Sequence, residues 1–258
     1  MPAPARPQQA PKTTPAPALP QQAPQTPREV GVVLVHGIGE QRPGFAAQAA
    51  RRLRRGARTY RVRAIPTECV WAPLLDKYER VFLAHIKHQG ASGNMAQRFA
   101  VGTLADAELY QSDDILRAAT RRLLDEAVAR VRVSPLMFVT HSLGALVVTD
   151  YLRLRPALRN VKLITMGCNL ELFGLTTNFD CPRQLRAFGK WVNLFDKDDA
   201  LGFPLNTGAD PGYARVLDAA VALKGDSWWG RLTRGTGLVH TQYWGDRELF
   251  SRTIPSLL

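Results

Sequence analysis

The chain has 258 residues, which is enough for one sizeable α/β domain with a buried core. Its 34 Lys and Arg against 22 Asp and Glu give a formal net charge of +12, which favours anionic partners but says nothing about the fold. The sequence shows no apolar run of about 18 residues and no apolar centre of a secretory signal, so we expect neither a membrane-spanning helix nor a signal peptide. Three scattered cysteines, Cys69, Cys168 and Cys181, indicate reduced thiols and a cytoplasmic location.

The N-terminal segment differs in composition from the rest of the chain. Residues 1–28 are mostly Pro, Ala and Gln, which cannot bury enough apolar surface to offset the entropy of ordering. We therefore expect a disordered tail over 1–28 and one α/β domain over 29–258.

Apolar, β-prone runs alternate with helical patterns along this domain. We expect strands at Val30–Val35, Glu68–Trp71, Leu136–Thr140, Val161–Met166, Trp191–Phe195 and Leu238–Val239. We expect helices over 45–55, 74–87, 114–131, 145–152 and 246–254. This alternation predicts a mostly parallel sheet with helices on both faces, and in such sheets a site lies beyond the carboxyl ends of the strands.

The helix over 114–131 has the clearest pattern. Ser112 or Asp113 can cap its N-terminus. Its expected buried stripe consists of Leu116, Ala119, Leu123, Ala127 and Val131. Glycines interrupt the pattern over 89–112, so we expect a mobile insertion there and a lid or cap over 72–112.

The most informative stretch is Pro135–Tyr151, because an apolar strand stops abruptly at His141-Ser142-Leu143-Gly144 and an apolar helix follows at once. Ser142 therefore lies on a sharp strand-to-helix turn above the end of the sheet. Such a turn exposes a serine hydroxyl and directs a helix N-terminus at whatever is bound there. This geometry predicts a nucleophilic serine.

A serine nucleophile needs a base, and the base needs an acid to fix its tautomer. In this architecture the order along the chain is Ser, acid, His, and His240 is the only histidine after Ser142. The acid should follow an intermediate strand, where Asp196, Asp198 and Asp199 compete. We select Asp199 and keep Asp196 as the alternative, because Asp196 at the strand end can instead bond loop amides.

Acyl transfer also needs N–H donors where the oxyanion develops. The backbone N–H of Leu143, directly after the serine, is one candidate. The second should come from the loop His36-Gly37-Ile38-Gly39 after an earlier strand, since glycines let backbone approach a ligand closely. Ile38 is the first choice for that donor and Gly39 the next.

These segments, VLVHGIGEQRPG (33–44), VTHSLG (139–144), NLFDKDDAL (193–201) and HTQYW (240–244), together resemble the α/β-hydrolase superfamily, and in particular its bacterial lipase- or esterase-like members. The resemblance covers about residues 30–250. It implies an eight-stranded, mostly parallel sheet and hydrolysis of an ester, thioester or amide without a cofactor. By position it makes Ser142 the nucleophile, Asp199 the acid and His240 the base. The chain departs from the usual G-x-S-x-G elbow at Thr140, which replaces the first glycine.

Two further signals concern ligands. His85 and His88 lie three residues apart on an expected helix, but no third ligand is evident, so we expect a polar helix face and no metal. The basic segment with Arg51, Arg52, Arg55 and Arg58 can contact an anionic membrane surface, and no nucleic-acid-binding motif is present.

We therefore expect a serine hydrolase that cleaves a carboxylic ester of lipid-like character through an acyl-enzyme on Ser142. The alternative is a catalytically weak or inactive binding protein on a hydrolase scaffold, with an anionic lipid surface as its partner, since fold does not dictate function.

Overall fold

The computed structural model describes residues 26–37, 41–75, 106–158, 161–170, 190–208, 211–224 and 238–258. Its centre is a sheet of six described strands in the order β2-β1-β3-β4-β5-β6, and every neighbouring pair is parallel. The strands are β1 (Arg28–Val35), β2 (Val62–Cys69), β3 (Leu136–His141), β4 (Lys162–Met166), β5 (Trp191–Asp196) and β6 (Val216–Val221). The expected α/β class with a parallel sheet is confirmed.

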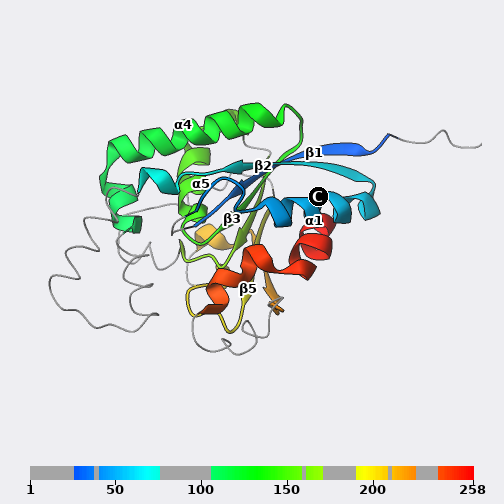
Figure 1. Cartoon of the computed structure of the whole chain (residues 1–258). Coiled ribbons are helices and arrows are strands. Elements are labelled where there is room, and N and C mark those ends of the chain that lie inside the picture. Colours follow the sequence, from blue (N-terminus) through cyan, green and yellow to red (C-terminus); the bar gives the residue numbers. More distant parts are fainter. Residues whose placement is uncertain are drawn as a thin grey trace, which may run out of the picture.

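Helices cover both faces of this sheet, as expected (Figure 1). On one face, α4 (Asp114–Val131) and α5 (Gly144–Arg153) bury Leu124 and Leu146 against the strands. On the other face, α1 (Ala47–Ala57) packs with the C-terminal helical segment and buries Leu53. The C-terminal segment comprises η7 (Leu249–Thr253), which is π-helical, and α9 (Ile254–Leu257).

Shorter helical pieces connect these elements. They are η1 (Arg58–Tyr60), η2 (Ala72–Leu74), a helical stretch over 106–112, η3 (Pro156–Leu158), η5 (Pro211–Tyr213) and η6 (Leu238–Gly245). The register aligns the carboxyl ends of the strands along one edge: Val35 of β1 faces Cys69 and Thr140, and His141 of β3 faces Met166. We call this edge the carboxyl edge.

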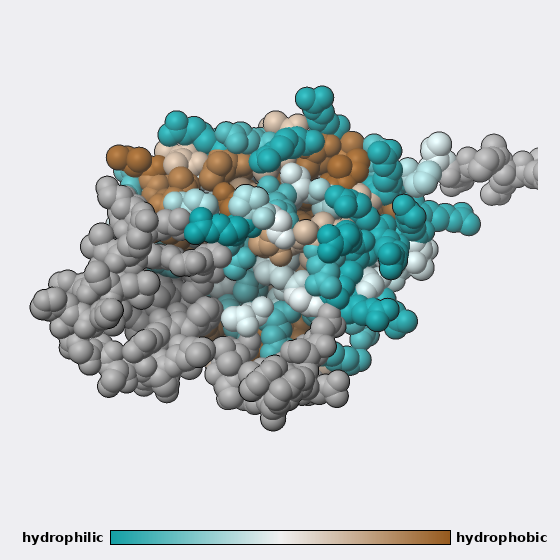
Figure 2. Space-filling view, viewed as in Figure 1, coloured by the Kyte–Doolittle hydropathy of each residue, from teal (hydrophilic) through white to brown (hydrophobic). Residues whose placement is uncertain are grey.

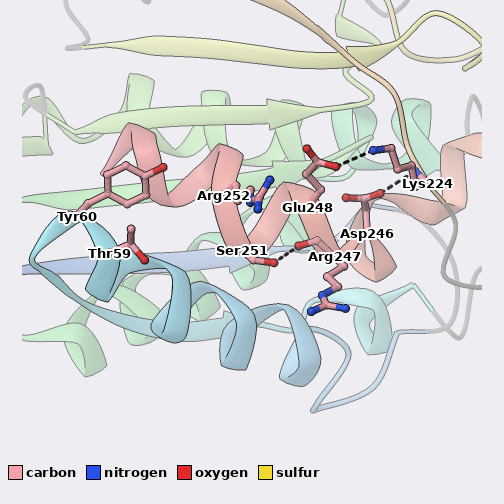
Figure 3. A pocket seen from close by; sticks show the side chains of 8 residues that line it. All are labelled: Thr59, Tyr60, Lys224, Asp246, Arg247, Glu248, Ser251 and Arg252. Carbon is pink, nitrogen blue, oxygen red and sulfur yellow. Dashed lines mark hydrogen bonds and ion pairs between the residues drawn. The ribbon is translucent and has the colours of Figure 1, made fainter.

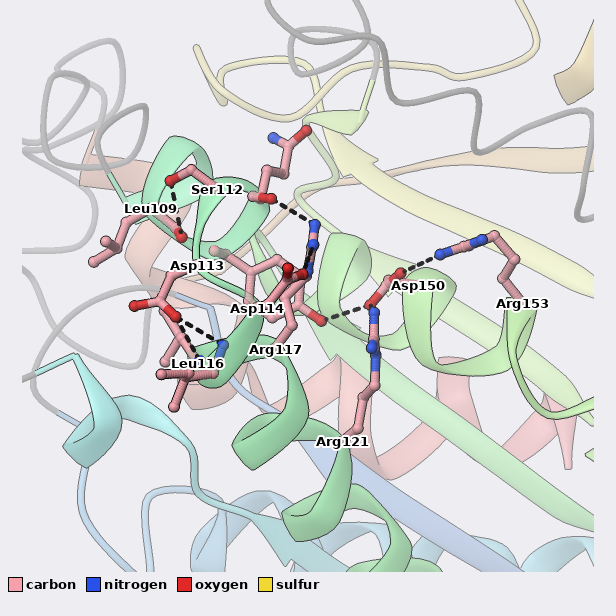
Figure 4. Close-up of polar contacts among 12 residues, drawn as sticks. Leu109, Ser112, Asp113, Asp114, Leu116, Arg117, Arg121, Asp150 and Arg153 are labelled. Atoms are coloured by element: carbon pink, nitrogen blue, oxygen red, sulfur yellow. Dashed lines mark hydrogen bonds and ion pairs between the residues drawn. The ribbon is translucent and has the colours of Figure 1, made fainter.

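Buried ion pairs hold α5 against its neighbours. Asp150 of α5 is nearly fully buried, and its carboxylate accepts hydrogen bonds from Tyr110 Oη at 3.0 Å and from Arg121 Nη2 at 2.7 Å (Figure 4). Arg153 pairs with the other oxygen at 3.1 Å. A buried carboxylate is tolerated only when paired and hydrogen-bonded in this way. The network therefore fixes α5, and with it the turn that precedes α5.

Helix α4 begins and ends where the sequence predicts, and Asp113 is its N-cap, with Oδ1 accepting from the N–H groups of Ile115 at 2.8 Å and Leu116 at 2.9 Å. The expected buried stripe was partly wrong. The buried residues are Leu116, Thr120, Leu124, Ala127 and Val131, and Ala119 and Leu123 are half-buried. Thr120 can be buried because its hydroxyl donates to the Leu116 carbonyl at 2.9 Å.

Three other expectations need correction. The predicted strand Leu238–Val239 belongs to η6, because two apolar residues do not extend into a strand. Strand β6 was not predicted, since VLDAAV at the sheet edge lacks the β-branched character of a buried strand. The strand expected at Glu68–Trp71 lies earlier, as β2 ends at Cys69.

The predicted insertion and tail are covered only in part. Residues 106–112 are helical, which contradicts the mobile insertion expected there, and the described start of the helix expected over 74–87 is the 3₁₀ turn η2. The rest of the lid or cap region, residues 76–105, lies outside the described residues, as does the tail up to residue 25. Arg28, which was assigned to the tail, is the first residue of β1.

Candidate active site

Ser142 lies between β3 and α5 with a backbone φ of +51°. A residue other than glycine is uncommon in the left-handed region and marks a turn that the surrounding structure enforces. The enforcing contacts include a hydrogen bond from Ser142 N to the Met166 carbonyl at 3.0 Å. The order of the strands in the sheet also reverses here, since β2 lies on one side of β1 and β3 lies on the other. Ligands of open α/β sheets bind at such a switch point.

Two glycines allow the end of β1 to touch the turn. A Cβ on Gly37 would lie 2.6 Å from Ser142 Cβ, and a Cβ on Gly144 would lie 2.5 Å from the His36 carbonyl oxygen. Neither position therefore accommodates a side chain unless backbone moves. The loop after β1 and the first residue of α5 are therefore in close contact next to Ser142.

Asp199 and His240 form a buried pair at the same edge. His240 Nδ1 lies 2.9 Å from Asp199 Oδ2 and 3.0 Å from Oδ1, and both side chains are fully buried. A proton on Nδ1 facing the carboxylate makes Nε2 the ring nitrogen that acts as a base. The structure thus brings together the two residues that the sequence analysis selected as acid and base.

Asp199 is held by further donors. Oδ1 accepts from Leu201 N at 2.9 Å, and Oδ2 accepts from Tyr243 Oη at 3.0 Å. Burial by itself raises the pKa of Asp199, but the hydrogen bond and charge of His240, followed by these two donors, outweigh it and lower the pKa below its usual value. The carboxylate therefore stays ionised beside the imidazole.

Two glycines pack closely against the Asp199 carboxylate. A Cβ on Gly202 would lie 2.4 Å from Asp199 Oδ2, and a Cβ on Gly167, where φ is +54°, would lie 2.9 Å from the same oxygen and 3.1 Å from His240 Cε1. Because a side chain at either position would clash with the Asp199 carboxylate, glycine is needed at both for that carboxylate to lie beside His240.

Asp196, the alternative acid, has a different role in the structure. Its Oδ1 accepts from Asp198 N at 2.9 Å and its Oδ2 accepts from Leu223 N at 2.7 Å. It therefore bonds loop amides and joins the ends of β5 and β6. The exposed Asp198 faces no histidine among the contacts of the described residues.

His141 packs against His240 and is hydrogen-bonded to its backbone. Its Nε2 lies 2.7 Å from the His240 carbonyl oxygen, and the two rings pack with centroids 4.7 Å apart. Burial, then the neighbouring His240, lowers the pKa of His141 to about 3. A neutral His141 donates its Nε2–H to that carbonyl and so holds the backbone of His240 in place.

His36 plays a comparable part at the end of β1. Its Nδ1 lies 2.7 Å from the Gly37 carbonyl, and its Nε2 accepts from Trp71 N at 3.0 Å and from Ala72 N at 3.3 Å. Its ring stacks on Trp71 with an interplanar angle of 3°. Burial lowers the pKa of His36 to about 4. A neutral His36 thus joins the loops that follow β1 and β2.

The predicted oxyanion donors are described only in part. Leu143 is buried directly before α5, and the first N–H groups of a helix have no acceptor within it. Ile38 and Gly39 lie outside the described residues. Thr140 is accommodated as a buried residue of β3, where its hydroxyl lies 3.5 Å from the Ile164 carbonyl.

Buried polar atoms without a hydrogen bond gather at this edge. They include Ser142 Oγ, both amide atoms of Asn169 in the loop after β4, and Trp244 Nε1 in η6. Buried polar groups in native proteins nearly always have a partner, so such a group marks a place where a ligand or water binds. The lack of a hydrogen bond at Ser142 Oγ also means that the serine–histidine bond is not formed here. Because Ser142 is fully buried, a substrate reaches it only after neighbouring groups move.

A hollow of about 620 Å³ lies between η1 and the C-terminal helical segment and is lined by Thr59, Tyr60, Lys224, Asp246, Arg247, Glu248, Ser251 and Arg252 (Figure 3). It contains none of the predicted site residues. Within the described ranges, no group of three His, Cys, Asp or Glu side chains is placed to hold a metal, and no helix is long and apolar enough to cross a bilayer. His85, His88 and Cys181 lie outside those ranges, and Cys69 and Cys168 are buried.

Sequence reasoning missed His141, Tyr243, Gly167 and Gly202. Tyr243 is the one with a signal in the sequence, because it lies three residues after His240. Residues three apart in a 3₁₀ helix such as η6 are eclipsed, so both side chains point to one carboxylate. The two glycines had no comparable signal, because their role depends on a contact between loops that are distant in the chain.

Comparison with known proteins adds no assignment. No protein-family model matches the chain, and no curated protein matches it significantly. What the site does must therefore be argued from its geometry.

The contact of Gly144 with His36 can be tested by Gly144→Ala. Helix propensity alone would favour alanine by about 1 kcal/mol, but a Cβ 2.5 Å from a backbone oxygen forces a backbone shift. We expect chemical denaturation to show a net loss of about 1–3 kcal/mol in the free energy of unfolding. Gly245→Ala is the control, because a Cβ there meets nothing within 4 Å. Equal effects of the two substitutions would contradict the contact.

The buried neutral histidines predict acid sensitivity. The unfolded chain protonates His36 near pH 6.5, but the folded chain does so only near pH 4, so the unfolded state binds more protons between these values. Stability is therefore fully present above pH 6.5 and falls as the pH drops towards 4, by about 1.4 kcal/mol per pH unit for this group. His141 adds a loss of the same sign. His36→Gln should remove one such contribution from the slope of unfolding free energy against pH, and an unchanged slope would show that His36 does not titrate in this way.

Proposed function

We propose that the protein is a serine hydrolase that cleaves a carboxylic ester of lipid-like character through an acyl-enzyme on Ser142. The observation that carries this proposal is the buried Asp199–His240 pair, 2.9 Å apart, at the same edge of the sheet as Ser142, whose backbone φ is +51°. The parallel sheet and the position of the turn at a switch point also support assignment to the α/β-hydrolase superfamily.

The aromatic surroundings favour an apolar acyl group. Phe45 packs edge-on against both His36 and Trp244, with centroids 5.1 Å apart in each case. Trp71 stacks on His36, and Trp244 lies edge-on to His141 at 6.5 Å. A site enclosed by such rings excludes water and accepts hydrocarbon better than charge.

In the first half-reaction, Ser142 Oγ attacks the ester carbonyl carbon and its proton passes to His240 Nε2. The carbonyl oxygen becomes an oxyanion, which the Leu143 N–H at the start of α5 is placed to bind. Asp199 stabilises the imidazolium through Nδ1. His240 then gives its proton to the departing alkoxide, the carbon–oxygen bond to the alcohol breaks, and the acyl group stays on Ser142.

In the second half-reaction, water attacks the acyl carbon while His240 Nε2 takes one of its protons. The bond from the carbon to Ser142 Oγ breaks, His240 returns the proton to Oγ, and the carboxylic acid leaves. His141 remains neutral throughout, because burial lowers its pKa to about 3, so no second positive charge opposes protonation of the His240 ring packed against it.

One observation favours a binding protein without catalysis. Ser142 Oγ is buried and makes no hydrogen bond, so the nucleophile and base are not engaged in this structure. Catalytic hydrogen bonds are often long or absent before substrate binds, and for this reason we retain the hydrolase as the first proposal.

Covalent labelling separates these two functions. A small fluorophosphonate should add its phosphorus to Ser142 Oγ with loss of fluoride, and Ser142→Ala should abolish the mass increase. Intact-protein mass spectrometry gives the readout, and peptide mapping gives the position. An unlabelled wild type that is shown to be folded, or labelling that persists in Ser142→Ala, would remove the proposed nucleophile.

The acid can be identified by a matched pair of substitutions. Asp199→Asn should lower kcat on short-chain acyl esters by about 10³–10⁴-fold, since it removes the charge that fixes the His240 tautomer. Asp196→Asn should leave kcat within about tenfold but lower the unfolding free energy by about 1–3 kcal/mol, because two loop amides lose a charged acceptor. The reverse ranking of kcat would transfer the role to Asp196.

A further inference from the structure

One exposed helix face carries an unusual concentration of arginine. Arg51, Arg54, Arg55 and Arg58 follow the i, i+3, i+4, i+7 spacing of α1 and η1, and all four are exposed. We call these four residues the arginine face. No acidic residue occurs between Arg42 and Thr67 to offset them. Figure 2 shows hydrophilic side chains gathered over this part of the molecule.

Acidic residues lie near one side of the arginine face: Arg51 and Arg54 line a hollow that also contains Glu68 and Glu126. None of its four residues forms an ion pair among the contacts of the described residues, whereas arginines elsewhere do: Arg121 pairs with Asp150 at 2.7 Å and Arg155 with Asp125 at 2.6 Å. The described contacts therefore pair arginines around α4 and α5 with carboxylates but pair none of the arginine face, and Arg55 and Arg58 do not line the hollow that holds Glu68 and Glu126. Unpaired guanidinium groups in a row are suited to phosphate, which each of them can bind in a bidentate manner.

The C-terminal helical segment, which packs on α1, carries further arginines. Gly56 packs directly on that segment, where a Cβ would lie 2.3 Å from the Ser251 carbonyl oxygen. Arg247 and Arg252 are exposed at the hollow shown in Figure 3, where Glu248 is already paired with Lys224 at 3.0 Å. Tyr60, which is 46% exposed, lies at the same hollow. The basic surface is thus broad and has an aromatic side chain within it.

The helix can adsorb to a surface but cannot insert into one. The opposite side of α1 buries Ala49, Ala50 and Leu53 in the core. Its N-terminus is also occupied, because Glu68 accepts from Gly44 N at 2.6 Å and from Ala46 N at 2.9 Å. Only the lateral arginines are available, so any binding is electrostatic and directed at an extended array of phosphates.

The arginine face is joined to the segment that bears His240. Arg52, which the sequence analysis counted among the surface contacts, is half-buried and donates from Nη1 to the Gly245 carbonyl at 2.5 Å. Gly245 ends η6, the segment that contains His240 and Tyr243. A surface that binds α1 therefore lies beside the element that carries the proposed base.

We propose that the arginine face is an electrostatic docking surface for a bilayer rich in anionic phospholipid. The choice of a bilayer over a nucleic acid rests on the proposed function, since an esterase for lipid-like substrates must meet them at an interface. Each basic residue near an anionic bilayer contributes enough to change partitioning by about five- to tenfold.

Vesicle binding tests this surface without relying on activity. The full chain is sedimented with vesicles of phosphatidylcholine and phosphatidylglycerol at low salt, and with phosphatidylcholine alone. Binding should require phosphatidylglycerol and weaken strongly as salt rises towards about 0.5 M, where charge is screened over a few ångströms. The double variant Arg55→Gln/Arg58→Gln should bind about 30-fold more weakly.

The matched control is Arg122→Gln/Lys190→Gln, which removes the same charge from exposed positions outside the arginine face. It should change binding less than about threefold. Equal loss in both double variants would show an effect of net charge alone and overturn the docking surface. Binding of duplex DNA but not of anionic vesicles at the same salt would also overturn it, and would assign the face to nucleic acid.

Hydrolysis of a water-soluble short ester separates this inference from the proposed function. Both double variants should keep wild-type kcat on that ester, because none of the four residues belongs to the site. Vesicle binding without any Ser142-dependent hydrolysis would remove the hydrolase and leave the docking surface standing. Hydrolysis without vesicle binding would do the opposite.

Discussion

The backbone of Ser142 is held in a conformation that its side chain disfavours, and the rest of the carboxyl edge is arranged around that constraint. The turn exists because Gly37 and Gly144 let the end of β1 come within contact of it, and because Met166 of β4 accepts its N–H. A non-glycine residue with a φ of +51° costs free energy that the neighbouring strands must supply. The two strands that flank β3 in the sheet, β1 and β4, therefore hold Ser142 in place from both sides.

Neutral histidines provide the second layer of this arrangement. His36 joins the loops after β1 and β2, and His141 joins the end of β3 to η6. Each uses one ring nitrogen towards a carbonyl, and each is buried deeply enough to stay uncharged. Imidazoles suit these positions because they combine a flat apolar body with a directed donor. The Asp199–His240 pair thus packs against the uncharged His141 ring, and its buried surroundings strengthen the hydrogen bond between its members.

The sequence was sufficient to predict the parts that depend on local pattern. The turn at Ser142 was readable from an apolar strand running into an apolar helix, and Asp196 was ranked second because a carboxylate at a strand end can bond loop amides, as it does in the structure. Strand β6 was missed because it lies at the sheet edge, where half-exposed alanines carry little β signal. The roles of Gly167 and Gly202 were not readable, since they arise where separate loops meet. Helix α4 was bounded correctly, although its buried stripe depended on how it is rotated against the sheet.

The close packing of Gly167 and Gly202 on the Asp199 carboxylate restricts how the sequence around this site can vary. Any side chain larger than hydrogen at either position would displace Asp199, so the two loops that follow β4 and β5 are free to change in length or composition only beyond these points. If the protein is the proposed hydrolase, changes in substrate preference would have to come from residues around the site other than Gly167 and Gly202. Libraries that aim to alter selectivity would accordingly leave both glycines fixed and vary the residues that line the approach to Ser142.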